Sequence, residues 1–267
     1  MIYYFSGTGN SLHVARQLAD RLCEQLSPIV NPVLTHDKSI GLVFPVYSWG
    51  IPSVVDNFIR RFFQSAEVQS ETTPAYVYAL MTCGDDVGYA DRVLDNALLS
   101  AAGRKFDAVF SVQMPNTYVC LPGFDVDSDE LCKAKLNRVQ ARVSEIAELV
   151  AARRKDVRRL KRGIFPFAKT YVVRPLFNRF LVTDKYFHVD ASKCVSCGRC
   201  RKSCPVGNIL LIPTTGGQGA EVKEVPKWMS HCSGCLACYH SCPHHAINFG
   251  NMTAAKGQYS IMKQLHG

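Results

Sequence analysis

Apolar residues in the first half of the chain form short runs that are separated by amphipathic segments. The runs cover residues 2–5, 40–46, 75–81 and 108–114, with a weaker one at 29–33. Near-continuous apolar runs of this length are typical of parallel strands that are buried on both faces. Because the segments between them have helical periodicity, the pattern predicts an α/β domain with a doubly wound sheet.

Four amphipathic helices are predicted, after the first, third, fourth and fifth strands. Pro52 suits the first turn of the second helix, Gly103 suits the end of the third, and the long fourth helix begins near Ser128. The predicted apolar faces are Leu12, Ala15, Ala19, Leu22 and Leu26; Val55, Phe58, Ile59, Phe62 and Phe63; Ala90, Val93, Leu94, Ala97, Leu98 and Ala101; and Cys132, Leu136, Val139, Val143, Ile146 and Val150.

The composition changes after the fourth helix. Residues 153–162 are strongly basic, and the formal net charge of +9 comes from the second half of the chain, because residues 1–127 are acidic on balance. We interpret the basic stretch as the solvated end of the long helix, where cations suit the helix dipole. The alternatives are a docking patch for an acidic redox partner protein, which we prefer among them, or a membrane surface. We expect no binding to nucleic acid.

Residues 163–187 are too rich in aromatic side chains for a solvated linker. We expect this segment to pack between the two halves of the chain, with an amphipathic membrane anchor as the alternative. No apolar run reaches the roughly 18 residues of a membrane span. The N-terminus shows no export signal, so we expect a cytoplasmic protein without a transmembrane segment.

The cysteines carry the most specific signal. Two copies of the pattern C-x2-C-x2-C-x3-C-P occur in the last third of the chain. In each copy, the first three thiolates are spaced to hold three corners of one iron–sulfur cube. The fourth lies too far along the chain to bind the same cube. Paired C-x2-C sequences also bind zinc, but a zinc site with four ligands does not account for the third cysteine and the Cys-Pro ending of each copy. The two copies contain Cys194, Cys197, Cys200 and Cys204, and Cys232, Cys235, Cys238 and Cys242.

A glycine-containing loop, Ser6-Gly7-Thr8-Gly9-Asn10-Ser11, lies between the first strand and the first helix. Its backbone N–H groups and hydroxyls, with the helix N-terminus, suit a phosphate group. It lacks the Lys of a P-loop NTPase and the G-x-G-x-x-G of a dinucleotide-binding fold. The alternative is an ordinary turn in which Asn10 or Ser11 caps the helix.

This loop resembles the phosphate loop of flavodoxins, which ends in Thr where this chain has Ser11. The resemblance covers about residues 1–150 and implies the strand order 2-1-3-4-5 and a bound FMN. The cysteine copies resemble bacterial two-cluster ferredoxins over about residues 186–250, which implies a small α+β domain with two [4Fe–4S] clusters. The combined layout resembles a known family of flavodoxin–ferredoxin fusion proteins.

The ferredoxin resemblance implies that each fourth cysteine binds the other cluster. Cluster one is then held by Cys194, Cys197, Cys200 and Cys242, and cluster two by Cys232, Cys235, Cys238 and Cys204. A departure is the 27-residue gap between Cys204 and Cys232, which we interpret as an inserted hairpin or loop at residues 214–220. Nearby histidines at 231, 240, 244 and 245 are expected to be surface or hydrogen-bonded residues, or protonated groups close to cluster two.

FMN is expected against three loops at the carboxyl edge of the sheet, where open α/β sheets bind ligands. Tyr47 or Trp49 can stack on the isoalloxazine ring, and amides of residues 82–84 can bond its pyrimidine edge. The predicted contacts are Ser6, Gly7, Thr8, Gly9, Asn10, Ser11, Pro45, Val46, Tyr47, Ser48, Trp49, Gly50, Thr82, Cys83, Gly84, Gly88 and Tyr89.

The predicted function is electron transfer between two [4Fe–4S] clusters and FMN, which couples one-electron carriers to one- or two-electron flavin chemistry. The alternatives are a flavin-dependent reductase of a small substrate such as a quinone, and a redox sensor. Because no acid–base pair or nucleophile stands out, the cofactors are expected to carry the chemistry. The predicted parts are an FMN domain (1–160), a connecting segment (161–185), a ferredoxin-like domain (186–250) and a tail (251–267).

Overall fold

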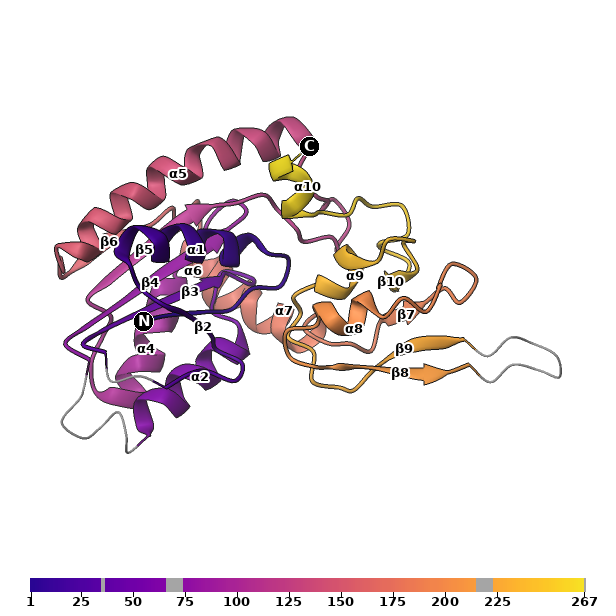
Figure 1. Ribbon diagram of the computed structural model, residues 1–267, viewed down its shortest axis with the longest axis horizontal. Helices are drawn as coiled ribbons and strands as arrows, with labels where there is room; N and C mark the ends of the chain where they lie inside the picture. Colours follow the sequence, from indigo (N-terminus) through magenta and orange to yellow (C-terminus); the bar gives the residue numbers. More distant parts are fainter. Residues whose placement is uncertain (35–36, 66–73, 215–222, 267) are drawn as a thin grey trace.

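The computed structural model describes residues 1–34, 37–65, 74–214 and 223–266. An α/β domain lies beside a smaller C-terminal domain (Figure 1). The α/β domain contains β1 (Ile2–Tyr4), α1 (Asn10–Leu22), β2 (Leu26–Pro28), β3 (Ser39–Pro45), α2 (Ser53–Gln64), β4 (Tyr76–Cys83), α4 (Ala90–Ala102), β5 (Ala108–Gln113), α5 (Asp129–Ala151) and β6 (Val157–Arg159). After it come α6 (Pro166–Ala168), the π-helix η1 (Lys169–Val173), α7 (Arg174–Phe180), β7 (Phe187–Val189), α8 (Arg199–Ser203), β8 (Ile209–Pro213), β9 (Glu224–Trp228), α9 (Ala237–Ser241), β10 (Ile247–Phe249) and α10 (Ile261–His266).

The strands of the large sheet are parallel and lie in the order β2-β1-β3-β4-β5-β6. The predicted order 2-1-3-4-5 is confirmed for the first five. Every residue of β4 is buried, as expected for a central strand with both faces covered. Its side chains alternate between two cores, since Val77, Ala79 and Met81 face one and Tyr76, Tyr78 and Leu80 face the other.

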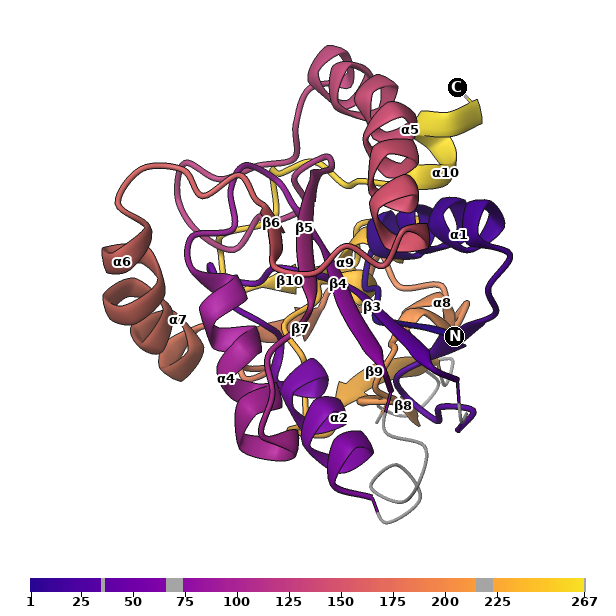
Figure 2. The ribbon, with the colours of Figure 1, turned by 90° about the vertical axis from the view of Figure 1, so that its left-hand side faces the viewer.

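Helices cover both faces of this sheet, with α1 and α5 on one face and α2 and α4 on the other (Figure 2). Ser128 caps α5 by accepting a hydrogen bond from the Leu131 N–H. Gly103 ends α4 in a left-handed conformation, with φ of 66°. The predicted apolar face of α2 is confirmed in full by its buried residues, Val55, Phe58, Ile59, Phe62 and Phe63.

The predicted end of the first helix and the predicted second strand are wrong by several residues. α1 ends at Leu22, because Cys23 takes a left-handed conformation with φ of 52°. Leu26, which was expected in the helix, begins β2 and pairs with Ile2. The sequence of β2 is Leu-Ser-Pro, so this short strand has no apolar run to mark it. The buried face of α1 includes Val14, Ala15, Leu18 and Ala19.

The basic stretch at 153–162 is a solvated continuation of the α5 end only at residues 153–156, so this prediction is wrong for residues 157–162. β6 adds a sixth strand beside β5 within the stretch. The Arg158 guanidinium lies 3.1 Å from the Asp95 carboxylate, and Arg162 donates two hydrogen bonds of 2.7 and 2.8 Å to Asp91. The Asp91 residue is only 4% exposed. These cations therefore neutralise carboxylates of α4 at the edge of the sheet.

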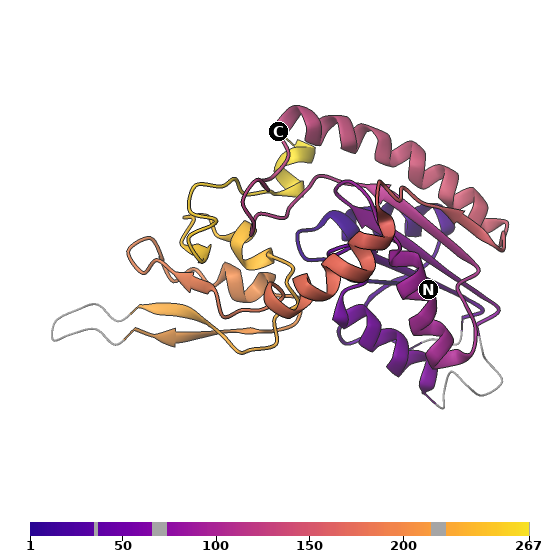
Figure 3. The same cartoon turned by 180° about the vertical axis from the view of Figure 1, so that it is seen from behind.

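The aromatic segment at 163–187 is anchored to the α/β domain through a buried threonine. Thr170 is buried, accepts a hydrogen bond from the Tyr89 N–H and donates one to the Trp49 carbonyl. The segment runs from the α/β domain to the C-terminal domain (Figure 3). We predicted that the aromatic run is buried between the domains. This prediction is wrong for most of the large apolar residues of the segment, which are at least 40% exposed: Ile164, Phe165, Phe167, Tyr171, Val172, Val173, Leu176, Phe180 and Tyr186.

The C-terminal domain is a small α+β unit, as predicted. β7 pairs with β10 and β8 pairs with β9, both antiparallel. The inserted hairpin or loop predicted at residues 214–220 falls almost entirely on residues 215–222, which lie outside the described residues. The core of this domain includes Val119 and Cys120 from the loop that follows β5. The two domains therefore share part of one core.

The tail, for which no role was expected, leads back to the α/β domain. Thr253, Tyr259 and Ile261 are buried. The Tyr259 hydroxyl donates a 2.6 Å hydrogen bond to Asn10 Oδ1, in the loop after β1. No helix among the described residues is both long enough and apolar enough to cross a membrane.

We expect Arg162→Ala to lower the free energy of unfolding by about 3 kcal/mol, because it leaves the buried Asp91 carboxylate without its partner. Chemical denaturation followed by circular dichroism measures this change. Lys105→Ala alters an exposed cation of the same domain and should change the free energy by less than about 0.5 kcal/mol. Equal effects of the two substitutions would show that Arg162 is only part of a solvated surface.

Candidate functional site

A cavity of about 540 Å³ lies where the carboxyl ends of the central strands face the C-terminal domain. Cavities of roughly 300–1,000 Å³ are typical of small-molecule and cofactor sites. Residues of all three predicted loops line it, which agrees with the rule that open α/β sheets bind ligands at this edge. The predicted residues on its wall are Gly7, Thr8, Asn10, Pro45, Val46, Tyr47, Ser48, Trp49, Thr82, Cys83 and Gly84.

The loop after β1 brings the two domains into contact. A methyl group at Gly7 would lie 2.6 Å from the Cβ of Cys235, so only glycine fits this position. The buried Ser6 hydroxyl has no hydrogen-bond partner in the described part of the chain. Ser11, in contrast, is used internally, because its hydroxyl hydrogen-bonds to Thr82 Oγ1 at 2.7 Å. Of this loop, Gly7, Thr8 and Asn10 line the cavity, whereas Ser6, Gly9 and Ser11 lie off its wall.

The loop after β3 forms a tight turn in which Tyr47 and Gly50 exchange backbone hydrogen bonds of 3.1 and 3.2 Å. Ser48 and Trp49 have positive φ angles of 46° and 55°. Such conformations are costly for non-glycine residues and concentrate at functional sites. Both predicted rings, Tyr47 and Trp49, lie on the cavity wall. Burial, with the nearby Cys235 thiolate, raises the pKa of Tyr47 well above its ordinary value, so its phenol stays protonated.

The end of β4 and the loop after it contribute Thr82, Cys83, Gly84, Asp85 and Asp86 to the wall, but not the predicted residues Gly88 and Tyr89. Burial raises the pKa of Cys83 to about 12, so this thiol stays neutral. Gly88 packs against the connecting segment, since a methyl group there would lie 2.7 Å from Thr170 Oγ1. The Tyr89 ring stacks under the Arg92 guanidinium at 3.8 Å. Gly88, Tyr89 and Gly50 therefore do not line the cavity.

The sequence prediction missed two parts of the wall. The loop after β5 contributes residues 114–118, Cys120 and Leu121. It ends a strand at the same edge of the sheet, so the rule used for the other loops would have found it. The inner side of the connecting segment contributes Lys169, Val173, Phe177 and Leu181. No local pattern marks these residues, because their place depends on how the segment crosses between the domains.

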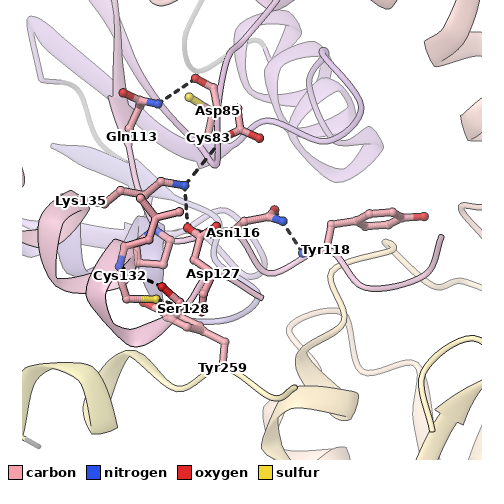
Figure 4. Close-up of polar contacts among 12 residues, drawn as sticks. Cys83, Asp85, Gln113, Asn116, Tyr118, Asp127, Ser128, Cys132, Lys135 and Tyr259 are labelled. Carbon is pink, nitrogen blue, oxygen red and sulfur yellow. Dashed lines mark hydrogen bonds and ion pairs between the residues drawn. The ribbon is translucent and has the colours of Figure 1, made fainter. Parts of the chain in front are cut away.

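A buried ion pair braces the loop after β5 (Figure 4). Lys135 on α5 lies 2.6 Å from Asp127 and 3.8 Å from Asp85. Asp127 also accepts a 2.9 Å hydrogen bond from the Asn116 N–H, and Asn116 Oδ1 accepts one from the Tyr118 N–H. This network holds the loop whose next residues enter the core of the C-terminal domain.

Gly234, Cys235 and Leu236 complete the wall from the C-terminal domain. His240 fixes this side, because its Nε2–H donates a 2.8 Å hydrogen bond to the Thr117 carbonyl while its Nδ1 accepts one from the Tyr259 N–H. Burial lowers the pKa of His240 to about 4, so the ring is neutral. The alternative of a protonated imidazole is therefore wrong for His240, which instead anchors one domain to the other.

The cysteine copies come together as two groups, each completed by the fourth cysteine of the other copy. One hollow is lined by Cys194, Cys197, Cys200 and Cys242. Cys204 lies with the second copy, since its thiolate adds to the effect of burial in raising the pKa values of Cys232, Cys235 and Cys238. The structure thus places each fourth cysteine near the other copy, and the binding of one cluster by each group stays a prediction.

Backbone N–H groups point at several of these sulfurs. Cys204 Sγ accepts from the Asn208 N–H at 3.2 Å, and Cys232 Sγ and Cys242 Sγ accept from the N–H groups of Gly234 and Ala246, both at 3.3 Å. Such donors favour the thiolate, which is the form that binds metal. Two sets of four thiolates supplied with N–H donors fit iron–sulfur clusters.

Residues 193–247 match the family model of the 4Fe-4S dicluster domain. Over 59 residues the chain is 34% identical to an uncharacterised ferredoxin of Methanocaldococcus jannaschii, in a match that covers 22% of this chain and 70% of that protein. The chain belongs to the ferredoxins with a 4Fe-4S dicluster domain. This finding supports iron–sulfur binding over zinc at the two cysteine copies. A ferredoxin domain of this type suggests electron transfer.

We expect the ferredoxin domain to hold about eight irons and eight acid-labile sulfides after anaerobic reconstitution. Cys242→Ala should lower the iron content, because it removes a ligand from the group that contains Cys194. Cys23→Ser, which alters an exposed cysteine outside the groups, should leave the iron content unchanged. Saturation of the unchanged protein at about four irons, or preferential retention of zinc, would contradict the two-cluster prediction.

Proposed function

We propose that the α/β domain is a flavodoxin-like domain that binds FMN in the cavity, and that the protein transfers electrons between this FMN and two [4Fe–4S] clusters. The main support is that Cys235, a proposed cluster ligand, shares the cavity wall with Gly7 and Thr8. Electron tunnelling falls steeply with distance, so a flavin in this cavity would exchange electrons readily with the cluster beside it.

The residues of the loop after β1 fit the phosphate of FMN. Thr8 lies on the cavity wall, and the buried hydroxyl of the nearby Ser6 has no hydrogen-bond partner among the described residues. Gly9 precedes α1, and no side chain of the described residues caps that helix end, so its first N–H groups remain available. The partial positive charge of the helix N-terminus favours an anion at this place.

The other loops fit the ring system. Tyr47 and Trp49 offer flat aromatic surfaces on the cavity wall, and aromatic rings favour offset or edge contacts with other rings. The Ser48 hydroxyl is buried without a hydrogen-bond partner in the described chain and could serve a polar edge of the ligand. Val173 and Phe177 of the connecting segment make the opposite side partly apolar.

The two cysteine groups would then have different neighbours. We assign cluster two to Cys232, Cys235, Cys238 and Cys204, and place it beside the cavity because Cys235 opens onto it. Cluster one, held by Cys194, Cys197, Cys200 and Cys242, lies in a separate hollow on the ferredoxin domain. This gives the order cluster one, cluster two, FMN for electrons that enter at the hollow.

When bound, FMN supplies a carrier for one or two electrons, whereas each cluster carries one. The chain itself supplies position and environment. His240 and the loop after β5 hold the ferredoxin domain against the cavity. Tyr47 places a neutral phenol, rather than a charge, next to the thiols of Cys232 and Cys235. Transfer within the chain is favoured over reduction of a separate substrate, because a cluster ligand forms part of the cavity wall.

We expect Thr8→Asp to abolish retention of FMN, because it places a carboxylate where the phosphate would bind. The iron content should remain that of the unchanged protein. Thr8→Ser keeps a hydroxyl and should retain flavin. The measurement is the ratio of flavin to protein after gel filtration, with the flavin identified by mass spectrometry. Bound FAD in the unchanged protein, or full retention of FMN by Thr8→Asp, would show that the proposed site is wrong.

A further inference from the structure

We propose that the surface around Cys194 and Cys197 is the docking site for a small, acidic, one-electron carrier protein. This proposal rests on the function proposed above, because it makes cluster one the point of entry or exit for electrons. In the step itself, one electron passes from the reduced carrier to cluster one, so that the carrier is oxidised and the cluster is reduced by one electron. No bond forms or breaks.

The two cysteine groups differ in their access to the surface. Cys197 is exposed, and the neighbouring Val195 is 54% exposed. In the second group, Cys235 faces the inner cavity and Cys238 is buried. A Cβ at Gly7 would collide with Cys235, which shows how closely the α/β domain covers this side. A partner protein can therefore approach cluster one closely, whereas the α/β domain occupies the approach to cluster two.

Basic side chains outnumber acidic ones around the accessible group, although Glu224 also lines the hollow. Arg199 lines the same hollow as the four cysteines, and Arg201 and Lys202 follow it on α8. All three are exposed, and none forms an ion pair with another described residue. Lys193, also on the hollow, makes a loose ion pair of 3.6 Å with Asp190. Residues 188–267 contain eight Lys and Arg against three Asp and Glu.

The chemistry of this surface selects the kind of partner. A field of one sign steers a partner of opposite charge and raises the association rate. Val195 adds an exposed apolar contact beside the cysteines. A small apolar centre within a charged rim suits the brief, weak complexes of electron carriers, which have small interfaces. The free guanidinium and ammonium groups call for carboxylates on the partner, so the partner is an acidic protein.

The test uses the reconstituted full chain and an acidic bacterial two-cluster ferredoxin as the probe. Stopped-flow absorbance follows cluster reduction by the reduced probe, and isothermal titration calorimetry measures binding of the oxidised probe. For the unchanged protein, the association rate constant should fall steeply as salt is added. Arg199→Glu combined with Lys202→Glu should lower this rate constant about tenfold at low salt and weaken binding in parallel.

Three controls make the result specific. Lys105→Glu combined with Arg16→Glu, an equal charge change at two exposed residues of the α/β domain, should leave the rate constant unchanged. The Arg199→Glu/Lys202→Glu protein should have the iron content of the unchanged protein. Dithionite should reduce its clusters to the same extent. The unchanged protein, freed of flavin before its clusters are reconstituted, should accept electrons from the probe at the same rate, because docking at cluster one does not need the flavin. A finding that the protein does not bind FMN would therefore contradict the proposed function, but it would not change the rate constant for reduction by the probe.

Two results would overturn the docking site. One is an association rate constant that the Arg199→Glu/Lys202→Glu change leaves unaltered. The other is an equal decrease in the Lys105→Glu/Arg16→Glu protein, which would show that only the overall charge of the protein steers the probe.

Discussion

The close approach of Cys235 to Gly7 is the contact on which the rest of the structure depends. A side chain at Gly7 would push the ferredoxin domain away from the loop after β1. Because electron tunnelling falls steeply with distance, a small increase in this separation would slow transfer between a cluster and a flavin in the cavity. The need to hold this contact explains features of the fold that a simple tether between two domains would not require.

Several connections hold the two domains in one arrangement. Val119 and Cys120 of the α/β domain lie in the ferredoxin core, and His240 bonds back to the loop that carries them. The tail returns from the ferredoxin domain and bonds through Tyr259 to Asn10. The neutral state of His240 matters here, because its Nδ1 must accept a hydrogen bond while its Nε2 donates one. These contacts join the loops of the cavity to the ferredoxin domain.

The sequence predicted the parts of this structure that follow from local patterns. The buried strands, the face of α2 and the two cysteine copies all show regular spacing, whereas the crossed pairing of the copies was implied by the ferredoxin resemblance. The predictions failed where partners distant in the chain decide the structure. β6 forms in a basic stretch because Arg158 pairs with Asp95 and Arg162 pairs with Asp91, both on α4. The segment around Thr170 packs as it does because the Thr170 hydroxyl bonds to the backbone of Trp49 and Tyr89. The loop after β5 was missed although the sheet-edge rule applied to it.

The central claim is that a cluster and a flavin exchange electrons within one molecule. Rapid mixing with a limiting amount of reduced viologen, with flavin and cluster absorbance followed separately, tests it most directly. The account predicts that clusters are reduced first and that the flavin then gains electrons with a rate constant independent of protein concentration. A flavin reduction rate that rises in proportion to protein concentration would contradict it, because electrons would then pass between molecules.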